Sequence, residues 1–159
     1  MSVEHGLCED FLDFMAALHD AGAEFIVVGA HAMAVHGVPR ATGDLDVLVR
    51  PSDDNAERVL EALHEFGAPV VEHGLTKDDL VTPGVVYQIG LPPFRIDVIT
   101  SIDGASFDEA SESRVEIAIQ NRPIGFLGKQ ILIRNKLATN REKDRADAHL
   151  LQRITADDT

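Results

Sequence analysis

The apolar and polar positions of this 159-residue chain alternate between helix-like and strand-like periods. Apolar residues at helical spacing predict a helix over 7–21 and a second helix that is capped by Ser52 or Asp53 and ended by Gly67. A β-branched apolar run predicts a buried strand over 25–28. A short helix is expected over 30–36, and alternation of polar and apolar residues predicts a strand over 44–49. Strands and helices in this order indicate an α/β or α+β fold.

The second half of the chain has the pattern of two hairpins followed by helices. Apolar runs at 85–89 and 94–99 are joined by a turn that contains Gly and Pro, and those at 115–119 and 123–127 flank a short polar turn. A helical region with one break is expected over 128–154.

Two acidic residues stand on one face of the predicted strand at 44–49. Asp44 and Asp46 alternate with Leu45 and Val47, so their backbone positions lie about 6–7 Å apart. A divalent cation between them would relieve their repulsion, and carboxylate oxygens without His or Cys favour Mg²⁺ or Mn²⁺. The alternative is a solvent-facing strand edge with two ordinary acids.

A third acid falls on the second strand of the first predicted hairpin. Arg95 and Asp97 alternate there with Ile96 and Val98, which gives the strand one polar and one apolar face. Asp97 is therefore a candidate to join the other two acids. The alternative is a surface aspartate on a hairpin.

A glycine turn and the acids that follow it resemble the motifs of a known family. The motifs are an apolar strand that ends in Gly29-Ala30, and then Arg40-x-Thr42-x-Asp44-x-Asp46. The chain resembles the nucleotidyltransferase superfamily with the DNA polymerase β-like fold, especially small prokaryotic members that include toxin-type (AbiEii-like) nucleotidyltransferases. Ala30 stands where that family has Gly or Ser. The resemblance implies a single nucleotidyltransferase-like domain over 1–159, with a mixed β-sheet, helices packed on one side and C-terminal helices.

The resemblance also implies an enzyme that moves a nucleoside monophosphate from a nucleoside triphosphate, such as ATP, to a hydroxyl group. Mg²⁺ or Mn²⁺ ions would be held by the acids that also act in catalysis: Asp44, Asp46 and Asp97. The phosphates would be bound by backbone N–H groups and side chains near these acids: Gly29, Ala30, Arg40 and Thr42. The acceptor would be a hydroxyl of a protein, an RNA or a small molecule.

A basic segment over 136–147 resembles the last helices of small nucleotidyltransferases. It is the main concentration of basic residues in the chain. The resemblance implies that Lys136 or Arg141 contacts triphosphate oxygens. The alternative is a surface helix whose charges form salt bridges, such as those of Arg141 and Arg145 with the neighbouring acids.

Charge narrows the choice of partners. The chain has 14 Lys and Arg against 27 Asp and Glu, a formal net charge of −13, which opposes unassisted binding to nucleic acid but leaves room for a local basic groove.

Cys8 is the single cysteine, so we expect no intramolecular disulfide and no thiolate metal site. No apolar run approaches the roughly 20 residues of a membrane span, and a cytoplasmic protein is expected. His31 either lines the site or packs as an ordinary imidazole.

Three functions are consistent with these features. The first is nucleotidyl transfer to a protein or an RNA, with the chain as the toxin of a toxin–antitoxin pair and an antitoxin as its partner. The second is transfer to a small molecule, as in antibiotic nucleotidyltransferases. The third is a catalytically degenerate member that binds nucleotide or a partner protein. The intact acids favour the first two, and Ala30 favours the third.

Overall fold

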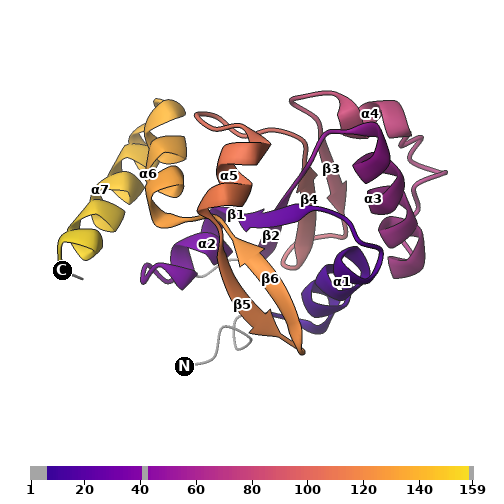
Figure 1. Cartoon of the computed structure of the whole chain (residues 1–159), viewed down its shortest axis with the longest axis horizontal. Coiled ribbons are helices and arrows are strands. Elements are labelled where there is room, and N and C mark those ends of the chain that lie inside the picture. The colour runs from indigo at the N-terminus through magenta and orange to yellow at the C-terminus, as the bar shows by residue number, and fades with distance from the viewer. Residues whose placement is uncertain (1–6, 41–42, 158–159) are drawn as a thin grey trace.

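The computed structural model describes residues 7–40 and 43–157, with the side chains of all but the last three of these residues. Within these ranges the chain forms seven helices and six strands (Figure 1). In chain order they are α1 (Glu9–Asp20), β1 (Phe25–Val28), α2 (Gly29–Val35), β2 (Asp44–Val49), α3 (Asp53–Phe66), α4 (Lys77–Val81), β3 (Val86–Ile89), β4 (Arg95–Ile99), α5 (Phe107–Ser113), β5 (Val115–Ile119), β6 (Arg122–Phe126), α6 (Lys129–Ala138) and α7 (Glu142–Asp157).

The six strands form one mixed sheet in the order β3-β4-β2-β1-β6-β5. β2 pairs with β4 and β1 pairs with β6 in parallel, and the remaining neighbours are antiparallel. The expected mixed sheet and both predicted hairpins, β3–β4 and β5–β6, are confirmed. In Figure 1, α3 and α4 lie to the right of the sheet and α6 and α7 lie to its left.

Alternate residues of the central strands enter two apolar clusters on opposite faces of the sheet. Val27, Leu45 and Val47 pack with residues of α1, α3 and α4. Ile26 and Leu48 pack with residues of α2, α5, α6 and α7. The helices expected on one side of the sheet are therefore α1, α3 and α4, while a second group covers part of the other face. The acids of β2 point to this second face, because they alternate with Leu45 and Val47.

Local sequence signals set the ends of several helices. Ser52 Oγ accepts a hydrogen bond from the backbone N–H of Asn55 at the start of α3, and Gly67 ends that helix with a φ of 93°. The elements expected from the sequence include no helix in the acidic segment before β5. α5 nevertheless forms there, because the side chains of Ser106 and Glu109 each accept the backbone N–H of the other. No helix in the described part of the chain is long and apolar enough to cross a membrane.

One buried amide joins the start of α3 to the ends of β1 and β2. Asn55 is 1% exposed, and its Oδ1 accepts a hydrogen bond from the Glu24 backbone N–H at 2.7 Å. Its Nδ2 donates to the carbonyl oxygens of Glu24 and Arg50, both at 3.0 Å. Glu24 precedes β1 and Arg50 follows β2, so this side chain fixes both strands relative to the helix.

Replacing Asn55 with Ala is expected to lower the free energy of unfolding by about 2–3 kcal/mol, because it leaves buried backbone groups without partners at about 1–3 kcal/mol each. Urea denaturation measures the change. Glu61→Ala, at an exposed position of the same helix, is the control and should change stability by less than about 0.5 kcal/mol. An Asn55→Ala protein as stable as the wild type would show that apolar packing alone holds α3.

Candidate active site

Parallel pairing of β2 with β4 brings the predicted acids to one surface. The register places Asp46 beside Asp97 and Asp44 beside Arg95. Neighbouring side chains in register point the same way from a sheet, and the carboxyl groups of Asp46 and Asp97 are in hydrogen-bonding contact. Asp97 is 8% exposed. It is therefore a buried acid beside another acid, not a surface residue of the hairpin.

Burial and repulsion together shift the pKa of Asp46. Loss of contact with water, then the charge of Asp97 and the hydrogen bond with it, raise the pKa of Asp46 to about 7. Asp44 adds a smaller repulsion, and Arg95 acts in the opposite direction. Without a bound cation, Asp46 therefore keeps its proton for much of the time near neutral pH. A cation placed against the two carboxyl groups would favour release of that proton.

The glycine turn lies directly against Asp46. Val28 pairs with Asp46 across β1 and β2, so the next residue, Gly29, meets the Asp46 side chain. Gly29 has a φ of 67°, and a Cβ atom there would overlap Oδ2 of Asp46. Glycine alone allows both the left-handed backbone and the close approach. Gly29 also begins α2, whose first N–H groups have no acceptor within the helix.

Arg95 lies between two of the three acids. Its Nη2 donates to Asp44 Oδ2 at 2.9 Å, and its Nε donates to Asp97 Oδ1 at 3.1 Å. Among the described residues, no group of three His, Cys, Asp or Glu side chains is arranged to hold a metal ion. The three acids thus share a face but are not converged on a common point.

The acids still fit a divalent ion by their chemistry. Asp46 and Asp97 offer adjacent carboxylate oxygens, which are the ligands that Mg²⁺ and Mn²⁺ prefer. The glycine at position 29 leaves the Asp46 carboxyl group accessible from the turn, where any larger residue would cover it. Asp44 lies two residues before Asp46 on β2, where it pairs with Arg95, and its Oδ2 would be available as a ligand only if Arg95 released it.

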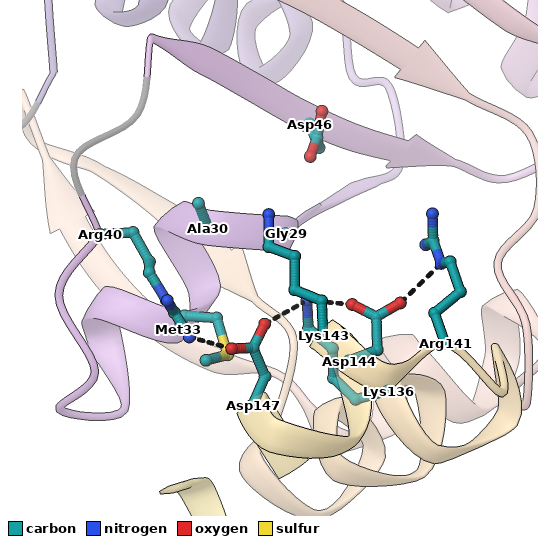
Figure 2. Close-up of a pocket in the computed structure, with 10 residues that line it drawn as sticks. All are labelled: Gly29, Ala30, Met33, Arg40, Asp46, Lys136, Arg141, Lys143, Asp144 and Asp147. Atoms are coloured by element: carbon teal, nitrogen blue, oxygen red, sulfur yellow. Dashed lines mark hydrogen bonds and ion pairs between the residues drawn. The ribbon is translucent and has the colours of Figure 1, made fainter.

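A cavity of about 500 Å³ extends from Asp46 to the C-terminal helices. Its lining residues are Gly29, Ala30, Met33, Arg40, Asp46, Lys136, Arg141, Lys143, Asp144 and Asp147. Figure 2 shows Asp46 on one side of this cavity and the residues of α6, α7 and their connection on the other side, with the Lys143 side chain extending across toward Gly29. Segments far apart in the sequence therefore form one cavity with acidic and basic walls.

Two buried acids hold the basic side chains of this cavity in place. Lys136 Nζ lies 3.3 Å from Asp144 Oδ1 and 3.2 Å from Asp147 Oδ2. Arg141 Nε lies 2.9 Å from Asp144 Oδ2, and Arg40 pairs with Asp147. Asp144 and Asp147 are only 5% and 4% exposed. Of the salt bridges that were one alternative for this segment, that of Arg141 is present, whereas Arg145 Nη1 donates to Asn140 Oδ1 at 3.0 Å. The ion pairs of Lys136 and Arg141 belong to the wall of a cavity and not to a fully solvated surface helix.

The structure brings most of the predicted site residues to this cavity: Gly29, Ala30, Arg40, Asp46, Lys136 and Arg141. Asp44 and Asp97 share the face of the acids but do not line the cavity, and Thr42 lies outside the described residues. Two further residues belong to the region, Lys143 and Arg95. Arg95 could have been found from its position two residues before Asp97 on one strand, and Lys143 from its place within the basic segment.

His31 packs beside the acids and does not line the cavity. It is 8% exposed, and its ring meets Phe11 edge-on with 5.6 Å between centroids. Burial lowers the pKa of His31, opposed by a hydrogen bond with the Asp44 backbone and by the Asp44 charge. Its Nε2 has no hydrogen-bond partner among the described residues. The ring is therefore a neutral, packed imidazole at pH 7.

Comparison with known proteins identifies the fold. No protein-family model and no curated protein sequence matches the chain. Among solved structures, a Thermotoga maritima protein provisionally assigned as a nucleotidyltransferase matches with a TM-score of 0.53 and 12% identity, over 91% of this chain and 89% of that chain. The lincosamide antibiotic adenylyltransferase LnuA with bound lincomycin matches with a TM-score of 0.55 and 12% identity, over 93% and 98%. ANT(2")-Ia in complex with adenylyl-2"-tobramycin matches with a TM-score of 0.52 and 13% identity, over 91% and 90%.

The chain has the nucleotidyltransferase fold. The resemblance seen in the glycine turn and the acids is thus confirmed at the level of the fold. Identities of 12–13% show the fold alone. The toxin-type subgroup stays a prediction.

The melting temperature of the metal-free protein is expected to fall as pH rises from about 4 to 8. The pKa of Asp46 is raised from 3.8 to about 7 in the folded protein, so the unfolded chain loses this proton first and folding becomes less favourable through that range. Asp46→Asn should flatten the curve and give a higher melting temperature than the wild type at pH 8.

Asp20→Asn is the control for this prediction, because the Arg122 hydrogen bond lowers the pKa of Asp20 and the expected effect has the opposite sign. That variant should be slightly less stable than the wild type at pH 8. Equal pH dependence for the wild type and Asp46→Asn would contradict the buried acid pair.

Proposed function

We propose that this protein transfers a nucleoside monophosphate from a nucleoside triphosphate to a hydroxyl group, with Mg²⁺ or Mn²⁺ as cofactor. The observation that carries the proposal is the cavity with Asp46 on one wall and four basic residues, Arg40, Lys136, Arg141 and Lys143, among its other lining residues. A triphosphate accompanied by divalent ions offers anionic oxygens to the basic wall and positive charge to the acids. The nucleotidyltransferase fold supports the proposal.

The cavity wall opposite Asp46 would bind the phosphates of the nucleotide. Lys136, Arg141 and Lys143 would pair with phosphate oxygens, and charge-assisted hydrogen bonds of this kind are the stronger ones. The first N–H groups of α2, from Gly29 and Ala30, would donate to the same phosphates. Ala30 still has this N–H group, so the absence of a Ser hydroxyl removes only one donor.

The acids serve the reacting atoms. The acceptor oxygen forms a bond to the α-phosphorus, the bond to pyrophosphate breaks, and Asp97 takes the hydroxyl proton. Divalent ions at Asp44, Asp46 and Asp97 would supply charge neutralisation for the phosphates and the attacking oxygen. Asp46, which lines the cavity, would act near the phosphates of the nucleotide. Asp97, its neighbour on β4, would act near the hydroxyl group of the acceptor.

An acceptor can approach Asp97 over the edge strand β3. Gln88 pairs with Asp97, and both Gln88 and Val86 are exposed on this face while Tyr87 and Ile89 enter the core. A small hydroxyl compound is the favoured acceptor, because the net charge of −13 opposes RNA and because two structural neighbours are by name adenylyltransferases or adenylyl-product complexes of antibiotics. A protein acceptor, as in a toxin controlled by an antitoxin, would use the same acids.

A degenerate protein that binds nucleotide without transfer is the second candidate. The ion pairs of Arg95 with Asp44 and Asp97 favour it, because they occupy oxygens that a metal would need. Incubation with each labelled nucleoside triphosphate, Mg²⁺ and cell lysate separates the candidates. Label in small molecules, protein or RNA identifies the acceptor class, and nucleotide binding without any transfer supports the degenerate protein.

Asp97→Asn is expected to lower the transfer rate by about 10²–10⁴-fold or more, since general-base catalysis alone contributes that factor. The dissociation constant for the nucleotide should change much less, because the phosphates contact the opposite wall. Asp46→Asn should weaken both binding and transfer. The measurements are single-turnover rates and nucleotide titration, and full activity of Asp97→Asn would remove Asp97 from the proposed chemistry.

Lys143→Ala is expected to weaken nucleotide binding by about tenfold, which is the loss of about 1.4 kcal/mol, because its side chain extends into the cavity. Titration with labelled nucleotide in the presence of Mg²⁺ measures the change. Lys77→Ala is the matched control, since Lys77 lies on α4 and pairs with Glu57 away from the cavity. Equal losses in the two variants would indicate a general effect of charge and not a phosphate contact.

A further inference from the structure

Arg95 is a basic side chain that contacts two of the acids at the sheet. Its side chain is 30% exposed, and its two nitrogens reach Asp44 at 2.9 Å and Asp97 at 3.1 Å. The contact with Asp97 follows from the two-residue period of β4, and the contact with Asp44 follows from the parallel register with β2. The guanidinium is therefore fixed by the same pairing that brings the acids together.

The position of Arg95 conflicts with a divalent ion held by all three acids. A cation bound among Asp44, Asp46 and Asp97 would meet the positive guanidinium at close range, and like charges at this distance repel strongly in a partly buried site. The carboxylate oxygens of Asp44 and Asp97 that accept hydrogen bonds from Arg95 also cannot coordinate a metal ion fully at the same time. The metal must therefore displace Arg95 or bind without Asp44.

The nucleotide offers Arg95 another partner. Its phosphates are anionic and would lie next to Asp46, and a guanidinium pairs well with phosphate oxygens. Metal and nucleotide arriving together can therefore free the acids and satisfy Arg95, whereas the metal alone would leave the guanidinium without a partner.

We propose that Arg95 is an internal counter-ion: it holds Asp44 and Asp97 when no metal is bound, and releases them when a nucleoside triphosphate and its divalent ion bind together. The release of the acids by nucleotide rests on the proposed function. The competition between Arg95 and a divalent ion for the acids does not. It makes Arg95 a positioning residue that couples the two ligands. By linkage, the factor by which the metal strengthens nucleotide binding equals the factor by which nucleotide strengthens metal binding.

Mn²⁺ binding to the nucleotide-free protein tests the proposal without any assay of activity. The free Mn²⁺ signal in electron paramagnetic resonance gives the dissociation constant. Arg95→Gln is expected to bind Mn²⁺ at least about tenfold more tightly than the wild type, since it removes a positive charge and the guanidinium contacts with Asp44 and Asp97. Arg95→Lys keeps the charge but loses the bidentate contact. Its Mn²⁺ affinity should therefore lie between those of the wild type and Arg95→Gln.

Arg122→Gln is the matched control. Arg122 also has a 30% exposed side chain and also pairs with an aspartate, Asp20, but it lies on β6 away from the acids. Its Mn²⁺ affinity should equal that of the wild type. A purely structural role for Arg95 would lower the melting temperature without tightening Mn²⁺ binding, so tighter binding separates the two roles.

Equilibrium dialysis of labelled ATP, GTP, CTP and UTP, with and without Mn²⁺, completes the test. We expect Mn²⁺ to strengthen nucleotide binding at least about tenfold in the wild type and by a smaller factor in Arg95→Gln. Unchanged or weaker Mn²⁺ binding by Arg95→Gln, with Mn²⁺-dependent nucleotide binding in the wild type, overturns the role of Arg95 and leaves the proposed function standing.

If the wild type binds none of the four nucleotides, the proposed function fails and the coupling fails with it, while the Mn²⁺ titrations still decide whether Arg95 competes with the metal. If Arg95→Gln does not fold, Arg95→Lys decides the matter. Mn²⁺ binding by Arg95→Lys that is no tighter than in the wild type then overturns the proposal.

Discussion

The contact between the carboxyl groups of Asp46 and Asp97 is the constraint on which the site depends. Burial makes each charge costly and proximity makes two charges costlier, which is why the pKa of Asp46 rises to about 7. The sheet can impose this contact because the opposite sides of β2 and β4 carry apolar residues, such as Leu45, Val47 and Val98, that are completely buried. Apolar packing on one face thus stabilises an electrostatic arrangement on the other.

The positive wall of the cavity arises by a different route. The chain has a net charge of −13, so its overall field cannot attract a phosphate. Asp144 and Asp147, which are themselves nearly buried, instead draw three basic side chains, those of Arg40, Lys136 and Arg141, to one place in the cavity wall. Acidic residues can therefore build a local basic surface, because the position of each charge matters more than the total.

The parts of the fold that follow from short-range patterns could be predicted from the sequence. Alternation placed the three acids on strand faces, and both hairpins formed as expected. Two features depend on long-range pairing and could not be predicted. The ion pair of Arg95 with Asp44 joins residues 51 positions apart and requires the β2–β4 register, and that of Arg40 with Asp147 joins residues 107 positions apart. The α5 helix was missed for a local reason, since its capping box is stronger than its weak apolar pattern.

The charges of the described site are divided between its two sides. Three acids meet one guanidinium at the sheet, and at the other wall three basic side chains pair with two carboxylates while Lys143 also lines the cavity. Each side is therefore only partly neutralised, with opposite excess charge across one cavity. A simple anion would suit the helices but be repelled by the acids, and a bare cation would have the reverse problem. A phosphate chain that carries its own divalent ions presents both signs in the required order, which is why the division of charge favours a metal–triphosphate complex over either component alone.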